Sequence, residues 1–325
     1  MKLRRLYCIF LPLLLAIMVA GLCFGSAPLS LSELAAALTG EGTARIILLG
    51  VRLPRVLAGL LAGIGLSAAG VLLQTVTAND LASPNIIGIN SGAGLAVILL
   101  LTLAPKAGAL LPLAAFLGAL GAALVILAAG NRLGSSRSGV LLVGIAVTTV
   151  FNAAISFLSL LDEGILAQYN HFTVGSLRGL GLDDLAVPAV IIFGALCAAL
   201  ALSGRLGVLG LGDAAASALG IRVRRLRLGA LACAAACAAA VVSFAGLLGF
   251  VGLVVPHMAR TLVGERPARM LPVSAMLGGG LVILADLLGR TLFAPSELPV
   301  GILMSLIGAP YFLILIARRG HHAGN

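Results

Sequence analysis

The sequence predicts an all-α polytopic membrane protein with about ten transmembrane helices. Three observations support this fold class. Hydrophobic residues make up 61% of the 325 residues and charged residues only 10%, whereas a soluble domain carries roughly a quarter charged residues. The hydrophobic residues form long unbroken runs, and a helix needs about 20 apolar residues to cross a bilayer. These runs lack the polar–apolar alternation of transmembrane β-strands, so helices are expected.

Ten hydrophobic segments can serve as membrane-spanning helices. They lie at about residues 6–25, 53–76, 86–103, 109–129, 139–160, 186–203, 228–249, 252–264, 271–293 and 299–317. The eighth is short and contains Pro256, so we expect it to be broken, tilted or shielded by neighbouring helices. No soluble segment separates the ten, so residues 1–325 are expected to form a single transmembrane domain.

The first segment follows Lys2, Arg4 and Arg5, as the hydrophobic part of a signal peptide does. It is long for such a part, and further hydrophobic segments follow it. We therefore interpret it as an uncleaved first helix.

The basic residues predict the orientation. With the N-terminus inside, 15 of the 21 lysines and arginines fall in cytoplasmic segments. The six outside are Arg45, Arg52, Arg55, Lys106, Arg178 and Arg290. Because basic residues gather on the cytoplasmic side of membrane proteins, we expect a multi-pass membrane protein with both termini in the cytoplasm.

Several other classes of function are disfavoured. The net charge of +10 is not arranged as a basic face with interleaved aromatic residues, so nucleic acid is not an expected partner. The five cysteines (Cys8, Cys23, Cys197, Cys233 and Cys237) all lie in hydrophobic runs, where we expect buried small side chains rather than disulfides or metal ligands. The phosphate-binding motif G-x-x-x-x-G-K-S/T is missing from the sequence. The chain is therefore expected to be no enzyme and to hold no cofactor or metal.

Three stretches are too polar, or too rich in Gly and Pro, to be ordinary spanning helices. The first contains RLPR at 52–55, Gln74 and NDLASP at 79–84; the second is LGDAAASALG at 211–220; the third contains GFVGLVVPHMAR at 249–260, ELPVG at 297–301 and GAP at 308–310. In this order and spacing they resemble the FecCD permease family of ABC importers for iron–siderophore complexes, haem and vitamin B12. The resemblance covers the chain from about residue 50 to Arg319.

The resemblance implies the type II ABC importer permease architecture. It implies a homodimer in membrane lipid, two cytoplasmic ABC ATPase subunits that hydrolyse ATP, and a periplasmic substrate-binding protein. The expected cargo is an iron chelate, with ferric siderophore favoured over haem and cobalamin.

The resemblance also implies a docking site for the binding protein. Its residues are Arg52, Arg55 and Arg290, whose guanidinium groups suit carboxylates of a partner. Two alternatives are interfacial snorkelling and pairing within the chain with Asp286 or Glu297.

The cytoplasmic loop from about 204 to 227 is the expected coupling element, a short helix followed by a basic run. The residues expected to contact the ATPase are Leu211, Gly212, Asp213, Ala214, Ala218, Leu219, Gly220 and Arg222. The alternative is that the loop only orients the chain by its positive charge, which would leave the short helix without a role.

Asn79 and Leu81 match residues at the cytoplasmic gate of the vitamin B12 permease. Most family members have Arg-Asn-Pro-Leu-Ala here, whereas this chain has Ala78 and Asp80 in place of Arg and Pro. The stiffness that the proline gives is therefore lost. Residues 134–139 are expected to form a second constriction.

Two rival functions remain at this point. An ion-coupled secondary transporter would need buried ionisable residues along its helices, and Asp286 is nearly the only candidate; we expect it to pair with Arg290 four residues later. A membrane protein without a transport role would leave LGDAAASALG and the outer arginines without a purpose.

Overall fold

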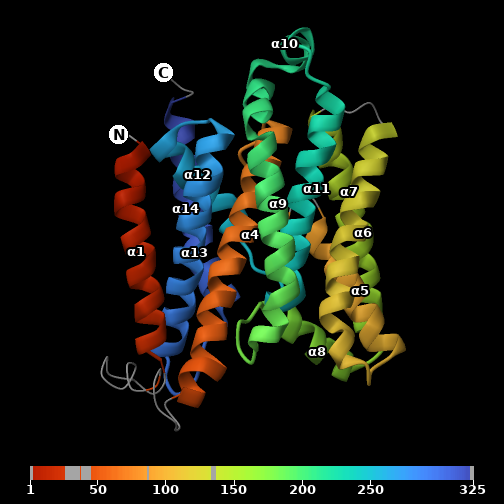
Figure 1. Ribbon diagram of the computed structural model, residues 1–325. Helices are drawn as coiled ribbons and strands as arrows, with labels where there is room; N and C mark the ends of the chain where they lie inside the picture. Colours follow the sequence, from red (N-terminus) through yellow and green to blue (C-terminus); the bar gives the residue numbers. More distant parts are fainter. Residues whose placement is uncertain (1–2, 26–36, 38–44, 86–87, 133–136, 323–325) are drawn as a thin grey trace.

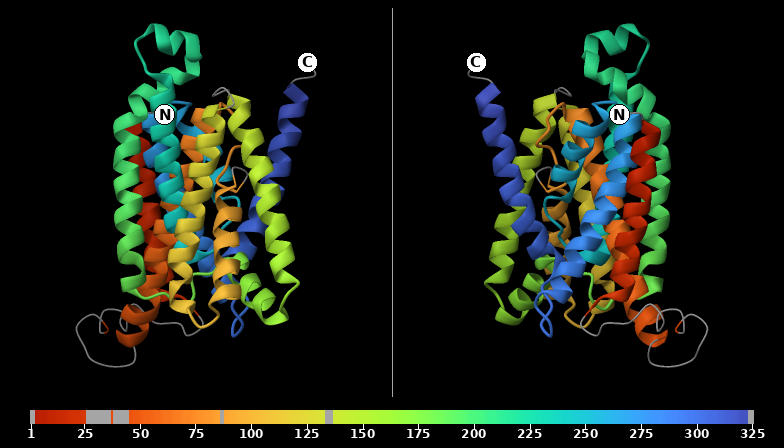
Figure 2. Two further views of the ribbon diagram at one scale, coloured as in Figure 1. Left: turned by 90° about the vertical axis from the view of Figure 1, so that its right-hand side faces the viewer. Right: turned by 90° about the vertical axis from the view of Figure 1, so that its left-hand side faces the viewer.

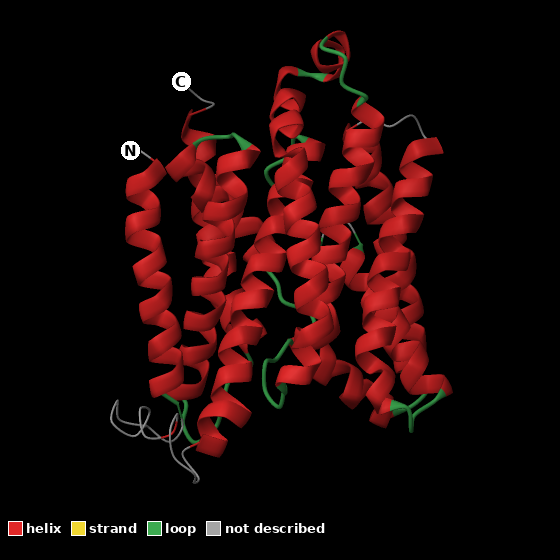
Figure 3. Ribbon diagram, in the orientation of Figure 1, coloured by secondary structure: helices red, strands yellow, loops and turns green. Residues whose placement is uncertain are grey.

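The computed structural model describes residues 3–25, 37, 45–85, 88–132 and 137–322 (Figure 1). This described part is built of helices and loops, with no strand (Figure 3). The long helices stand side by side in one bundle, as two perpendicular views show (Figures 1 and 2). The predicted all-α membrane fold is confirmed.

Ten helices correspond to the ten predicted spanning segments. They are α1 (Leu3–Cys23), α4 (Leu53–Thr77), α5 (Ile89–Leu103), α6 (Leu111–Arg132), α7 (Arg137–Ser159), α9 (Leu182–Val208), α11 (Val223–Ala245), α12 (Val251–Val263), α13 (Pro267–Thr291) and α14 (Val300–His322). Seven stretches are long and apolar enough to cross a membrane, while α5, α12 and residues Val300–Ile314 of α14 are shorter apolar helices.

Within the described residues, five short helices lie between the long ones. They are η1 (Ile46–Arg52), η2 (Gly108–Leu110), α8 (Glu163–Val174), η3 (Leu209–Leu211) and α10 (Asp213–Ala218). The two ends of the bundle differ in what they carry. One end carries α10 and the first and last described residues, and we call it the α10 end; the opposite end carries α8 and is called the α8 end (Figure 1).

Helix α4 is the centre of the packing. It contacts α13, α11, α12 and α9, and most of its residues are buried. Glycines allow these contacts: a Cβ atom on Gly63 would overlap the backbone of Gly278 in α13, and one on Gly70 would overlap the carbonyl group of Gly252 in α12. Such close approach of backbones is how helices associate in lipid, where the hydrophobic effect does not drive them together.

The short helix α12 is shielded rather than broken. It runs continuously through Pro256, and its first six residues, Val251 to Pro256, are buried. Helices α4, α13 and α14 pack around it. Of the three outcomes expected for this segment, shielding by neighbours is the one observed.

The lateral surface of the bundle is apolar. Large hydrophobic side chains such as Val190 on α9 (74% exposed) and Val150 on α7 (65% exposed) lie outside the core, as expected where lipid or another subunit replaces water. Cys8 and Cys197 also lie on this exposed surface, so the expectation that all five cysteines are buried is wrong for these two. A hydrophobic segment of a membrane protein has an outward face as well as an inward one, and the sequence did not distinguish them.

Candidate functional site

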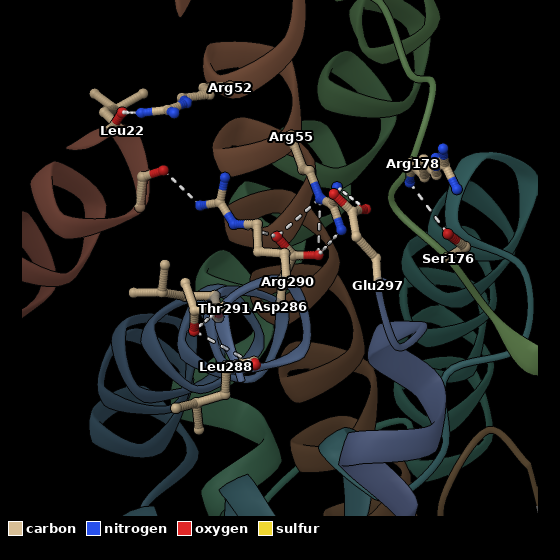
Figure 4. Close-up of polar contacts among 12 residues, drawn as sticks. Leu22, Arg52, Arg55, Ser176, Arg178, Asp286, Leu288, Arg290, Thr291 and Glu297 are labelled. Atoms are coloured by element: carbon tan, nitrogen blue, oxygen red, sulfur yellow. Dashed lines mark hydrogen bonds and ion pairs between the residues drawn. The ribbon is translucent and has the colours of Figure 1, made fainter. Parts of the chain in front are cut away.

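A network of buried charges occupies the α8 end (Figure 4). Nε of Arg55 in α4 donates hydrogen bonds to both carboxylate oxygens of Asp286 in α13, at 2.9 and 3.0 Å. Nη1 of the same arginine donates to Glu297, just before α14, at 2.8 Å. The side chains of Arg55 and Asp286 are only 8% and 4% exposed, so this pair joins two helices in a site that is almost free of water.

Two further arginines attach α1 to this network. Nη1 of Arg52 donates to the carbonyl oxygens of Leu22 and Cys23, both at 2.7 Å. Nη2 of Arg290 donates to the carbonyl oxygen of Gly21, while its Nε lies 3.5 Å from Asp286. The last carbonyl groups of a helix have no partner within the helix, and here arginines supply the donors.

The three arginines predicted to dock a binding protein are therefore buried inside the subunit, at 3–7% exposure. The pairing with Asp286 and Glu297 that we considered as an alternative is present, and the expected Asp286–Arg290 pair is confirmed. The docking role itself stays a prediction.

An open cavity of about 370 Å³ lies beside the network. Its polar lining includes Arg55, Glu297, Asn170, His171 and Arg178. Arg178 is exposed, and its backbone N–H donates to the hydroxyl of Ser176 at 3.2 Å. Arg178 was expected on the outer side without a role; its position shortly after the short α8 segment was the available signal.

At the opposite end, α10 forms a short helix with a defined end. The N–H of Gly220 donates to the carbonyl of Ser217, and the N–H of Ile221 donates to the carbonyl of Ala216. This pair of bonds is the Schellman motif, which needs a left-handed residue at its turn. Gly220 supplies it with φ of 78°, so the predicted short helix and its glycine boundary are confirmed.

The predicted coupling residues surround α10 and are mostly open to solvent. Leu211 and Leu219 are 69% and 66% exposed, and Ala214, Ala218 and Arg222 are exposed too. Within the helix only Ala216 is buried. Both leucines belong to the segment around α10 that stands beyond the bundle (Figure 2).

One ion pair fixes α10 to the bundle. Asp213, its first residue, accepts a hydrogen bond from Nη2 of Arg227 in α11 at 2.7 Å. Arg227 is buried while Asp213 is half exposed. Part of the basic run thus has a structural partner, which the sequence did not assign.

The predicted gate residues form a tight turn after α4, residues 78–82, which we call the gate turn. Ala78 ends the helix in the left-handed conformation, with φ of 48°. The side-chain oxygen of Asn79 accepts a hydrogen bond from the N–H of Leu81 at 2.9 Å, an Asx turn. Leu81 is 39% exposed. Residues 134–136 of the second predicted constriction lie outside the described residues.

A polar cluster lies next to the gate turn. Nη1 of Arg260 in α12 pairs with Asp80, and Nη2 of Arg260 donates to the side-chain oxygen of Gln74 at 3.2 Å. Sequence reasoning noted Gln74 and Arg260 only as parts of motifs, because their separation of 186 residues gives no sign of contact.

The described residues contain no group of three or more His, Cys, Asp or Glu side chains that could hold a metal ion. The polar features at both ends are instead ion pairs and hydrogen bonds between helices. Such an arrangement can support contact with partners and movement of helices.

Comparisons with known proteins cover nearly the whole chain. The FecCD transport family matches residues 13–318. The haemin transport permease HmuU of Yersinia pestis is 36% identical over 322 residues, covering 97% of this chain and 96% of HmuU. The ferric enterobactin permease FepD of Escherichia coli is 40% identical over 277 residues, covering 84% of this chain and 82% of FepD.

A solved structure is also similar to this chain over nearly its whole length. It is described as a metal-chelate type ABC transporter in an inward-facing conformation, and it superimposes with a TM-score of 0.88 at 29% identity, covering 97% of this chain and 99% of that one. The chain therefore belongs to the FecCD transport family of membrane permeases.

Proposed function

We propose that this chain is the membrane permease subunit of an ABC importer in a bacterial inner membrane. Two copies work with two cytoplasmic ATPase subunits and a periplasmic binding protein, and residues 1–325 act as one membrane domain. The α10 end faces the cytoplasm, because the basic run around Arg222 is there and basic residues gather on that side. The chain moves its cargo without catalysing a reaction.

The observation that carries this proposal is the exposed surface around α10. Exposed apolar side chains on a protein that already has lipid to cover its flanks indicate a protein partner. Leu211 and Leu219 lie on a segment beyond the bundle rather than on a lateral face. A short helix that sits in a groove of a partner is a common recognition mode, and an ATPase subunit fits it.

The cargo is proposed to be an iron chelate, with ferric siderophore favoured. Relatives are named for Fe(3+)-citrate in Bacillus subtilis, enterobactin in Escherichia coli, haemin in Yersinia pestis and cobalamin in Halobacterium salinarum. Three of these four are iron compounds, two of them chelates of the siderophore or citrate kind. The α8 end, with its open cavity beside Arg178, then faces the binding protein.

Docking at the α8 end is proposed to act through the charge network. A carboxylate from the binding protein can reach Arg55 through the cavity, since that arginine lines it together with Glu297. The guanidinium groups of Arg52 and Arg290 donate hydrogen bonds to carbonyl oxygens of α1. Their proposed contribution is therefore to position α1 at the surface that the binding protein contacts.

The rival, an ion-coupled transporter, finds less support. Among the described residues Asp286 is the one buried acid, and it is paired with Arg55 and Arg290. A carboxylate held by two arginines is a poor carrier of protons or sodium ions, because release of the ion pairs would leave buried charges.

The test is reconstitution of the permease with its ATPase and binding protein in liposomes. We expect the double variant Leu211→Glu, Leu219→Glu to lose co-purification of the ATPase subunits and ATP-driven uptake. The matched control is Leu160→Glu, Leu161→Glu, which alters two exposed leucines at the α8 end and should keep the ATPase bound. Uptake driven by an ion gradient without ATPase subunits would overturn the proposal.

A further inference from the structure

We propose that the ion pair between Asp80 and Arg260 holds the gate turn against α12, and so controls how readily this turn moves. Both are positioning residues: they act on the gate turn rather than on the cargo. The inference rests on the proposed function and on the prediction from the sequence that Asn79 and Leu81 of this turn lie at a cytoplasmic gate of the importer.

The gate turn has the local bonds that set its shape. The N–H of Leu81 bonds to the side chain of Asn79, and the N–H of Ala82 donates to the carbonyl of Asn79 at 3.1 Å. Both bonds lie within the turn. They do not fix its position relative to the neighbouring helices. Burial of Ala82 in the core helps to do so, and a side-chain contact from the turn to another helix can add to it.

Asp80 makes that contact. Its carboxylate pairs with Nη1 of Arg260, 180 residues later in the chain. The two side chains are 29% and 16% exposed, so the pair is partly shielded from water and is stronger than a surface ion pair.

The cluster continues into both helices that meet there. Arg260 also donates to Gln74, which is 2% exposed. The amide nitrogen of Gln74 in turn faces the carbonyl oxygens of Gly252 and Leu253 at 3.5 and 3.4 Å. Gln74 thus bridges the two ends of α12, and the guanidinium of Arg260 has a second partner that keeps it aimed at Asp80.

The helix dipoles explain why these two charges need each other. Asp80 follows the C-terminal end of α4, where the dipole disfavours an acid, while Arg260 lies in the last turn of α12, where the dipole favours a cation. Without Arg260 the carboxylate would face the negative ends of two helices.

Hydrogen–deuterium exchange on the full chain in lipid nanodiscs tests the proposal. The amides of Leu81 and Ala82 are hydrogen-bonded in the turn, so their exchange reports its opening. We expect Asp80→Asn to speed exchange of residues 79–85 about fivefold, since a partly shielded ion pair is lost. Glu265→Gln is the matched control, because it removes an exposed acid shortly after α12 and should leave this exchange unchanged.

Two further variants show whether faster exchange comes from loss of the ion pair or from a general loss of stability of the fold. Arg260→Gln should speed exchange in the same segment, and the charge-swapped double variant Asp80→Arg, Arg260→Asp should restore at least part of the protection. Thermal unfolding checks that each variant is folded. Exchange in Asp80→Asn equal to the parent, or no recovery in the swapped variant, overturns the proposal.

The exchange experiment uses the permease alone, so its result does not depend on the cargo. If the reconstituted importer fails to take up any chelate while Asp80→Asn speeds exchange, the proposed function fails and the ion pair stands. If ATP-driven uptake is intact and exchange does not change, only the role of Asp80 and Arg260 fails.

Discussion

Removing the charge of Asp286 is the sharpest test of the network at the α8 end. In Asp286→Asn the side chain keeps its size but can no longer neutralise Arg55 and Arg290. Both arginines are buried, at 7% and 3% exposure, so water cannot replace the lost carboxylate. The variant therefore leaves two cations close together in a site of low polarity.

The expected loss of stability depends on the hydrogen bonds that Arg55 and Arg290 keep in the variant. Removal of one partner from a buried ion pair costs about 3–5 kcal/mol. Arg55 keeps its 2.8 Å bond to Glu297 and Arg290 keeps the carbonyl of Gly21, so we expect the lower end, about 3 kcal/mol. This loss of stability should weaken the packing of α13 against α4.

The free energy of unfolding can be measured in mixed micelles by adding a denaturing detergent and following helix content by circular dichroism. Asp183→Asn is the matched control, because this acid lies exposed in the first turn of α9 and should change stability by less than about 0.5 kcal/mol. Equal stability of Asp286→Asn and Asp183→Asn would refute the view that this carboxylate holds the network together.

Two further predictions concern the backbone of α4. Gly63→Ala would bring a methyl group into the backbone of Gly278 and should lower the free energy of unfolding by about 2–3 kcal/mol in the same assay. The control Gly121→Ala places its methyl group in open space and should change this free energy by less than about 1 kcal/mol. Equal effects of the two variants would contradict the close crossing of α4 and α13. Ala78→Gly relieves a left-handed residue and should raise the midpoint of thermal unfolding, with a gain of about 0.5–1 kcal/mol; a loss of stability would show that the left-handed turn is not strained.

The sequence was sufficient to predict the membrane fold and its ten helices. Hydrophobic length is a local property, and even the short helices α5 and α12 were predicted as segments 86–103 and 252–264; in the structure Gly88 precedes α5 and Gly264 follows α12. The Schellman end of α10 was predictable for the same reason.

The partners of the charged residues were not predictable in full. The Asp286–Arg290 pair is four residues apart on one helix and was expected. Arg55 meets the same carboxylate across 231 residues; this pairing was considered only as an alternative to docking, because nothing local decides between the two. For the same reason, the sequence assigned no partner to Asp80 across the gate turn.

Burial of Arg52 and Arg290 was missed because the sequence places them near the outer membrane interface, where arginines commonly extend into water. Here the carbonyl groups at the end of α1 attract them inward. A helix end that lacks its own capping residue can recruit a donor from another helix, and this depends on packing that only the folded chain shows.

The glycine contacts of α4 have a mechanical consequence. Gly63 and Gly70 lie near the middle of a helix about 37 Å long, where α13 and α12 touch its backbone. If α4 tilts as a rigid rod about these contacts, Arg55 at one end of the helix and the gate turn at the other move in opposite directions. One helix thus joins the charge network at the α8 end to the gate turn, and its contact region with α13 and α12 is made of glycines, which have no side chain.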